Sequence, residues 1–163
     1  MKKVLLVIVF VLGLWKDCGA QNKKIDSLLT VLKTAKEDTL KINILNKLAW
    51  EIREELPDSA KSYCNQSFVL IKKLTSNTND RYIKEWLELA TTDVNNNLGV
   101  LNNVVYQNHK AAMEYHLKNV AIRERLLHSP YPYIVWRSKR GLGDSYKNVG
   151  AAYMGDDEKT MEY

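Results

Sequence analysis

The feature that most constrains this fold is a large apolar residue followed by alanine or glycine, which recurs three times within a helical pattern. The three steps are Leu48-Ala49, Leu98-Gly99 and Val149-Gly150, so the small residue stands at positions 49, 99 and 150. Where two helices cross closely, a larger side chain pushes the backbones apart, and a large neighbour fills the adjacent gap. The steps therefore predict repeated helical hairpins packed face to face.

Apolar residues at helical spacing predict a series of helices with short breaks. Asp38 or Thr39 is expected to cap the second helix, and Pro57 to begin the third. The prolines of Ser129-Pro130-Tyr131-Pro132-Tyr133 predict a kink. The predicted helices span residues 24–36, 39–56, 57–74, 81–106 and 109–127.

The segment after this kink is predicted to be a further, incomplete copy. Gly141-Leu142-Gly143 is either a turn or a weak point in a long helix, and Asp144 or Ser145 is interpreted as a helix cap. Tyr146, Val149, Gly150 and Tyr153 recur at helical spacing, and an elbow is expected at 155–157.

The composition favours an all-α globular domain. Of the 163 residues, 45% are apolar and 26% are charged, which is typical of a soluble folded protein. Seven glycines and three prolines leave room for long helices, and alternating β-branched runs are scarce. We divide the chain into residues 1–20, an N-terminal helical segment at 21–38, and repeats at 39–163, with copies at about 39–75, 81–128 and 134–163.

The first 20 residues have the layout of a secretory signal peptide. Lys2 and Lys3 precede an apolar run from Val4 to Leu14, and small residues end at Ala20. The run is shorter than the ~20 residues that a membrane-spanning helix needs. We expect cleavage after Ala20 and export to the periplasm or the medium. The alternative is that the uncleaved segment anchors the protein in the membrane.

Cleavage would change the charge and the cysteine count. Residues 1–20 hold three lysines and one aspartate, so the net charge of +5 falls to +3. Cys18 would leave with the signal, and Cys64 would remain alone without a partner for a disulfide. Cys64 lies on the apolar side of its predicted helix, which favours a buried packing role over a reactive thiol.

Several of these residues resemble the tetratricopeptide repeat (TPR) family. Asn97-Leu98-Gly99 with Ala112-Met113-Glu114-Tyr115, and Asn148-Val149-Gly150-Ala151-Ala152-Tyr153, are similar to its helix-turn-helix units of ~34 residues. The mature chain also resembles the exported N-terminal region of TPR proteins and sensor histidine kinases of the Bacteroidetes group. The resemblance implies a short superhelix of stacked hairpins. It assigns repeat packing to Leu48, Ala49, Leu98, Gly99, Ala112, Tyr115, Val149, Gly150 and Tyr153.

The family's geometry also implies a binding surface. First helices line the concave face of such a superhelix, which commonly binds a peptide or a partner helix. Asparagine suits capture of a peptide backbone, because its amide offers a donor and an acceptor. The alternative is that these residues form ordinary solvated helix faces. The groove residues implied are Asn43, Asn46, Trp50, Arg53, Asp93, Asn96, Val100, Asn103, Lys147 and Ala151.

Two functions follow as expectations. The first is a non-catalytic interaction scaffold that binds a protein or peptide. The alternative is the extracytoplasmic sensory input region of a longer receptor of the histidine kinase type. A superhelix usually needs a polar capping helix, and Tyr163 falls inside the last predicted helix, so we expect a truncated chain. Membrane attachment is expected only if the signal stays uncleaved or the chain is a receptor fragment.

Other functions find little support in the sequence. No nucleophile, base and orienting group occur together, so we expect no enzyme and no cofactor. His109, His116 and His128 lack a second cluster of ligand residues, so we expect no metal. Basic and aromatic residues between Arg123 and Arg140 resemble a nucleic-acid surface, but export makes a nucleic-acid partner improbable.

Overall fold

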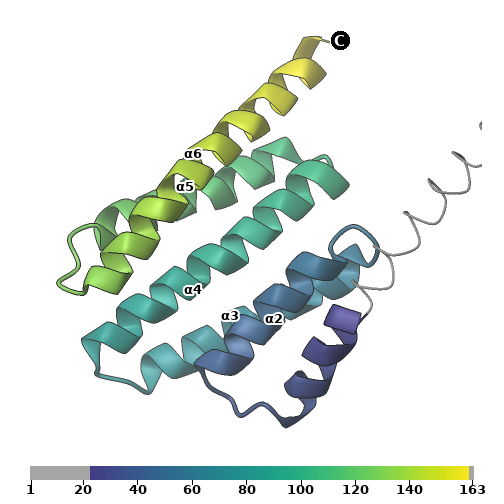
Figure 1. Ribbon diagram of the computed structural model, residues 1–163. Helices are drawn as coiled ribbons and strands as arrows, with labels where there is room; N and C mark the ends of the chain where they lie inside the picture. The colour runs from purple at the N-terminus through teal and green to yellow at the C-terminus, as the bar shows by residue number, and fades with distance from the viewer. Residues whose placement is uncertain (1–22, 162–163) are drawn as a thin grey trace, which may run out of the picture.

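The computed structural model describes residues 23–161, and every regular element in this range is helical, which confirms the all-α prediction. The signal-peptide prediction for residues 1–20 lies outside the described residues. None of the described helices is long and apolar enough to cross a bilayer. The elements are a helix at 23–34, then α2 (Thr39–Ile52), α3 (Pro57–Ser76), α4 (Arg81–Val100), the short π-helix η1 (Leu101–Val105), α5 (His109–Leu126) and α6 (Pro132–Met161) (Figure 1).

The ends of the helices follow from local chemistry. The Asp38 side chain accepts hydrogen bonds from the amides of Leu40 and Lys41, which confirms the predicted cap. Pro57 occupies the first turn of α3 as predicted. However, α2 ends at Ile52 and not at Leu56. The residue before a proline is driven towards extended geometry, and Leu56 has φ −134° and ψ 65°. A turn over residues 53–55 therefore replaces the last predicted turn of helix.

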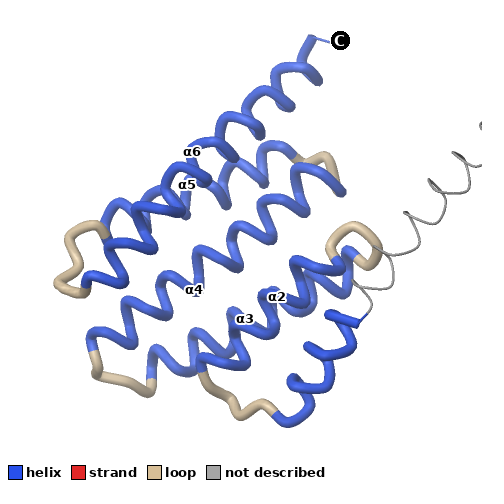
Figure 2. The backbone as a smooth tube through the Cα atoms, in the orientation of Figure 1, coloured by secondary structure: helices blue, strands red, loops and turns tan. Residues whose placement is uncertain are grey.

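The helices form successive antiparallel pairs. The pair α2 and α3 is followed by the pair α4 and α5, and α6 packs along α5 (Figure 1). Short loops connect the members of each pair (Figure 2). α4 contacts both α2 and α3, and α6 contacts both α4 and α5. Both α4 and α6 thus pack on both members of the preceding pair.

The main core lies between α2, α3 and α4. Ala49, Cys64, Val94 and Leu98 belong to one buried cluster of these helices. Cys64 is fully buried as predicted, and burial raises the pKa of its thiol to about 12. A second cluster joins Leu89, Leu126 and Ile134 between α4, α5 and α6.

Helix α6 differs most from the sequence prediction. It runs without interruption from Pro132 to Met161, so residues 141–143 form no turn, Asp144 and Ser145 cap no helix, and the elbow at 155–157 does not form. Two of its glycines are places of close approach and not turns. Gly141 lies against the Arg123 side chain, and a Cβ on Gly155 would come within 2.7 Å of the His109 ring.

Candidate functional site: a polar cleft between α2, α4, α5 and α6

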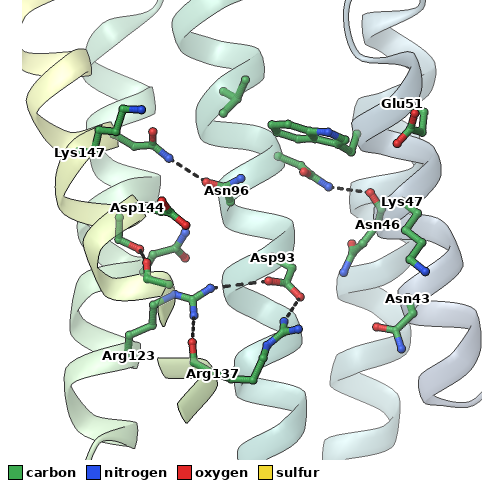
Figure 3. A pocket seen from close by; sticks show the side chains of 17 residues that line it. Asn43, Asn46, Lys47, Glu51, Asp93, Asn96, Arg123, Arg137, Asp144 and Lys147 are labelled. Carbon is green, nitrogen blue, oxygen red and sulfur yellow. Dashed lines mark hydrogen bonds and ion pairs between the residues drawn. The ribbon is translucent and has the colours of Figure 1, made fainter. Parts of the chain in front are cut away.

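A polar cleft opens where α2, α4, α5 and α6 meet (Figure 3). Its volume is about 550 Å³, within the range of roughly 300–1,000 Å³ that is common for ligand pockets. Four basic and three acidic side chains line it, so its charge is nearly balanced. The lining residues are Asn43, Asn46, Lys47, Trp50, Glu51, Asp93, Asn96, Asn97, Val100, Asn119, Arg123, Arg137, Gly141, Asp144, Ser145, Lys147 and Asn148.

Most of the groove residues predicted from the sequence lie in this cleft. They come from α2, α4 and α6, three helices that are far apart along the chain but adjacent in space. The predicted residues that line the cleft are Asn43, Asn46, Trp50, Asp93, Asn96, Val100 and Lys147. Arg53, Asn103 and Ala151 do not line it.

Local contacts account for the positions of Arg53 and Asn103 outside the cleft. Arg53 is the C-cap residue of α2 and keeps helical backbone angles, φ −59° and ψ −30°. Its guanidinium group lies 3.8 Å from the centre of the Trp50 ring and donates to Glu54 Oε1 at 2.8 Å. Asn103 falls in the π-helix, whose wider turn shifts side chains to another face. Its Oδ1 lies 2.7 Å from His109 Nδ1. Both side chains therefore lie outside this cleft.

Asp93 joins two arginines from two other helices (Figure 3). Arg137 Nη2 of α6 donates to Asp93 Oδ2 at 3.1 Å, and Arg123 Nη2 of α5 lies 3.7 Å from Asp93 Oδ1. Burial raises the pKa of Asp93, while the charges of both arginines act in the opposite direction. These ion pairs connect α4 to both helices on the far side of the cleft.

Arg123 is unusually buried for a charged residue. Its side chain is 8% exposed, and Nη1 donates to the backbone oxygen of Arg137 at 3.1 Å. Burial lowers the pKa of Arg123. Arginine nevertheless stays charged at neutral pH, because its ordinary pKa is above ~12. The guanidinium group lies over the backbone of Gly141, where a Cβ would overlap it.

A pair of asparagines closes the cleft between α4 and α6. Asn148 Nδ2 donates to Asn96 Oδ1 at 2.9 Å, and this part-buried contact crosses the cleft wall (Figure 3). The other amide atom of each side chain makes no hydrogen bond within the described part of the chain. One amide nitrogen, Asn96 Nδ2, and one amide oxygen, Asn148 Oδ1, therefore have no hydrogen-bond partner among the described residues.

Asn46 contributes polar atoms without protein partners to the base of the cleft. The residue is 8% exposed, and neither Nδ2 nor Oδ1 has a hydrogen-bond partner among the described residues. The neighbouring Asn97 differs, because its Nδ2 donates to the Asn46 backbone oxygen at 3.0 Å. An unpaired buried polar group costs ~1–3 kcal/mol, so Asn46 is an unfavourable residue for folding alone.

Asn46→Leu is therefore expected to raise the free energy of unfolding by up to about 1 kcal/mol, since leucine has a similar shape and no polar atoms. Urea denaturation measures the change. Asn97→Leu is the matched control and should lower the free energy of unfolding by ~1–3 kcal/mol, because it removes a buried hydrogen bond. Equal losses in the two variants would show that the Asn46 amide does stabilise the fold.

Apart from Lys147, the sequence did not predict the residues on the α5 and α6 side of the cleft. Asn148 could have been found from the sequence, because Asn97-Leu98-Gly99 and Asn148-Val149-Gly150 share the asparagine and the glycine around one large apolar residue. Arg123 and Arg137 both lie in the basic run from Arg123 to Arg140, whose pattern indicated only a nucleic-acid surface. Arg123 also lies on α5, a second helix, whereas the resemblance implied that first helices line the groove.

The residues predicted to pack the repeats lie in two kinds of environment. Leu48, Ala49, Leu98, Gly99 and Ala112 are buried, and Tyr115 packs against the main core. In the third copy, Val149 is half-buried, Tyr153 is 57% exposed, and a Cβ on Gly150 would meet no described atom within 4 Å. The Val149-Gly150 step therefore does not lie at a close crossing of two helices within the described chain.

The chemistry of the cleft is that of hydrogen bonding and ion pairing. Among the described residues, no group of three or more His, Cys, Asp or Glu side chains is placed to hold a metal ion. No family model, curated protein or solved structure matches this chain.

Proposed function

We propose that this protein is a non-catalytic interaction scaffold of the TPR type, which binds an extended peptide in the polar cleft. The helix pairs stack as a short superhelix in this proposal. The packing of α4 on α2 and α3, and of α6 on α4 and α5, supports it. In such a stack the first helices of successive pairs share one concave face, and here they are α2, α4 and α6.

The observation that carries this proposal is that one cleft collects polar side chains from these three helices. Its width spans successive repeats, as expected for a ligand that runs across them. The lining favours an extended peptide over a partner helix. A partner helix buries an apolar stripe, whereas only Trp50 and Val100 among the lining residues of the cleft have large apolar side chains. The volume of about 550 Å³ also suits a short segment of chain.

A selection from a random peptide library displayed on phage tests this function with the full-length chain as bait. We expect enriched peptides to bind the purified protein, with affinity measured by fluorescence anisotropy. The double variant Trp50→Ala, Asn96→Ala should weaken this binding by at least about tenfold, which corresponds to ~1.4 kcal/mol.

Asn65→Ala serves as the matched control for that measurement. Asn65 is an exposed asparagine of α3 outside the cleft, so its loss should leave the affinity unchanged. Circular dichroism should show that both variants keep the helical signal of the wild type. The proposal is wrong if no peptide is enriched, or if the cleft variant binds the enriched peptides as tightly as the control.

A further inference from the structure

The side-chain amides of Asn96 and Asn148 bond to each other through one nitrogen and one oxygen, and the remaining nitrogen and oxygen complement a peptide main chain. Each carboxamide has a donor and an acceptor side, and the bond between Asn148 Nδ2 and Asn96 Oδ1 uses one of each. Asn96 Nδ2 and Asn148 Oδ1 remain. In the orientation that the structure has, Asn148 supplies the remaining acceptor and Asn96 the remaining donor.

We infer that this pair recognises the main chain of the bound peptide, through one carbonyl oxygen and one N–H group. This inference rests on the proposed function and specifies what the cleft recognises. Both residues lie at the wall of the cleft and are half-buried, so a ligand in the cleft can reach them. An extended chain presents N–H and carbonyl groups along its length, as a strand does to a neighbouring strand.

The electrostatics of the cleft agree with a neutral recognition group. Asp93 offsets one of the two arginines with which it pairs, so the seven charged lining residues carry a net charge of only +1. Lys47 and Lys147 are matched in number by Glu51 and Asp144, and Glu51 is ion-paired with Lys24. A ligand selected by charge would need a larger excess of one sign. The amide backbone requires none.

The inference has a consequence for sequence selectivity. Main-chain hydrogen bonds are the same for all residues except proline, which lacks the N–H. Peptides that bind should therefore vary widely at the position beside the asparagine pair but exclude proline there. Selectivity would come from neighbouring contacts with the exposed ring of Trp50 and with Val100.

A backbone ester scan of the tightest peptide from the library tests this inference. An ester replaces one amide, removes its N–H and leaves the side chains intact. We expect an ester at one position to weaken binding to the wild type by about tenfold. In Asn148→Ala, which removes the acceptor, the same ester should cost less than about threefold.

Asn96→Asp tests the donor side of the pair. Aspartate still accepts from Asn148 Nδ2, but its second oxygen replaces the free donor, so peptide affinity should fall by about tenfold or more. Asn65→Ala is again the control and should leave the ester effect unchanged.

Peptide binding and main-chain recognition by the asparagine pair can be disproved separately. If no peptide binds, the proposed function is wrong and this inference falls with it. If peptides bind but every ester costs the same in the wild type and in Asn148→Ala, peptide binding stands and main-chain recognition by this pair is wrong.

Discussion

Replacing Gly99 with alanine is expected to lower the free energy of unfolding by about 1–3 kcal/mol, the usual cost of overpacking a core. A Cβ at this position would come within 2.6 Å of His116 Nε2. The imidazole is 1% exposed and has no room to move away without displacing its neighbours. Thermal or urea denaturation followed by circular dichroism measures the change.

The expected effect at Gly150 has the opposite sign. Gly150 is also preceded by a large apolar residue in a helix, but a Cβ there would meet no described atom within 4 Å. Alanine is favoured over glycine in a helix by ~1 kcal/mol, so Gly150→Ala should raise the free energy of unfolding by up to this amount. A loss would instead mean that another segment packs on this face, as a complete third repeat requires.

The role of His116 is isolated by a double-mutant cycle. In a His116→Ala background, the ring that blocks the methyl group is gone, so Gly99→Ala should cost nothing or be slightly stabilising. The interaction between the two substitutions is then about 1–3 kcal/mol. A cost for Gly99→Ala that persists without the imidazole would show that a different neighbour limits the space.

The contrast between Gly99 and Gly150 shows what the sequence could and could not predict. Helical periodicity is a local property, so it predicted where α2 to α5 lie to within a few residues. Whether a glycine is crowded depends on a side chain that another helix brings to it. Nothing in the identical pattern of Leu98-Gly99 and Val149-Gly150 indicates that only the first step faces a buried ring.

In the cleft, too, the residues of single helix faces could be predicted from the sequence, whereas those that depend on packing between helices could not. The TPR resemblance implied which face of each first helix lines the groove, and Asn43, Asn46, Asp93, Asn96 and Lys147 of that face line the cleft. Two residues of that face do not line the cleft: the Arg53 guanidinium lies over the Trp50 ring, and Asn103 falls in the π-helix η1. The resemblance gave no indication of Arg123, because this residue lies on α5 and meets the cleft through its contacts with Asp93 of α4 and Arg137 of α6.

Gly141→Ala is expected to lower the free energy of unfolding by about 1–3 kcal/mol, because the new methyl group overlaps the buried Arg123 guanidinium. Arg123 would have to move away from the Arg137 backbone oxygen and from Asp93, its two partners. The Cβ of Gly143, two residues later on the same helix, would meet nothing within 4 Å. Gly143→Ala is thus a matched control that reports the gain in helix propensity alone, up to ~1 kcal/mol.

Combining Gly141→Ala with Arg123→Met separates steric overlap from an effect on the helix. Methionine keeps an unbranched apolar side chain and removes the guanidinium, so Gly141→Ala in this background should behave like Gly143→Ala. The pair Asp93 and Arg137 survives in the double variant, because its 3.1 Å hydrogen bond does not involve Arg123. If the loss persists in the Arg123→Met background, the guanidinium is not the obstacle. If it disappears, the small size of Gly141 is what allows a charged side chain of α5 to lie beneath α6 and connect both helices to α4.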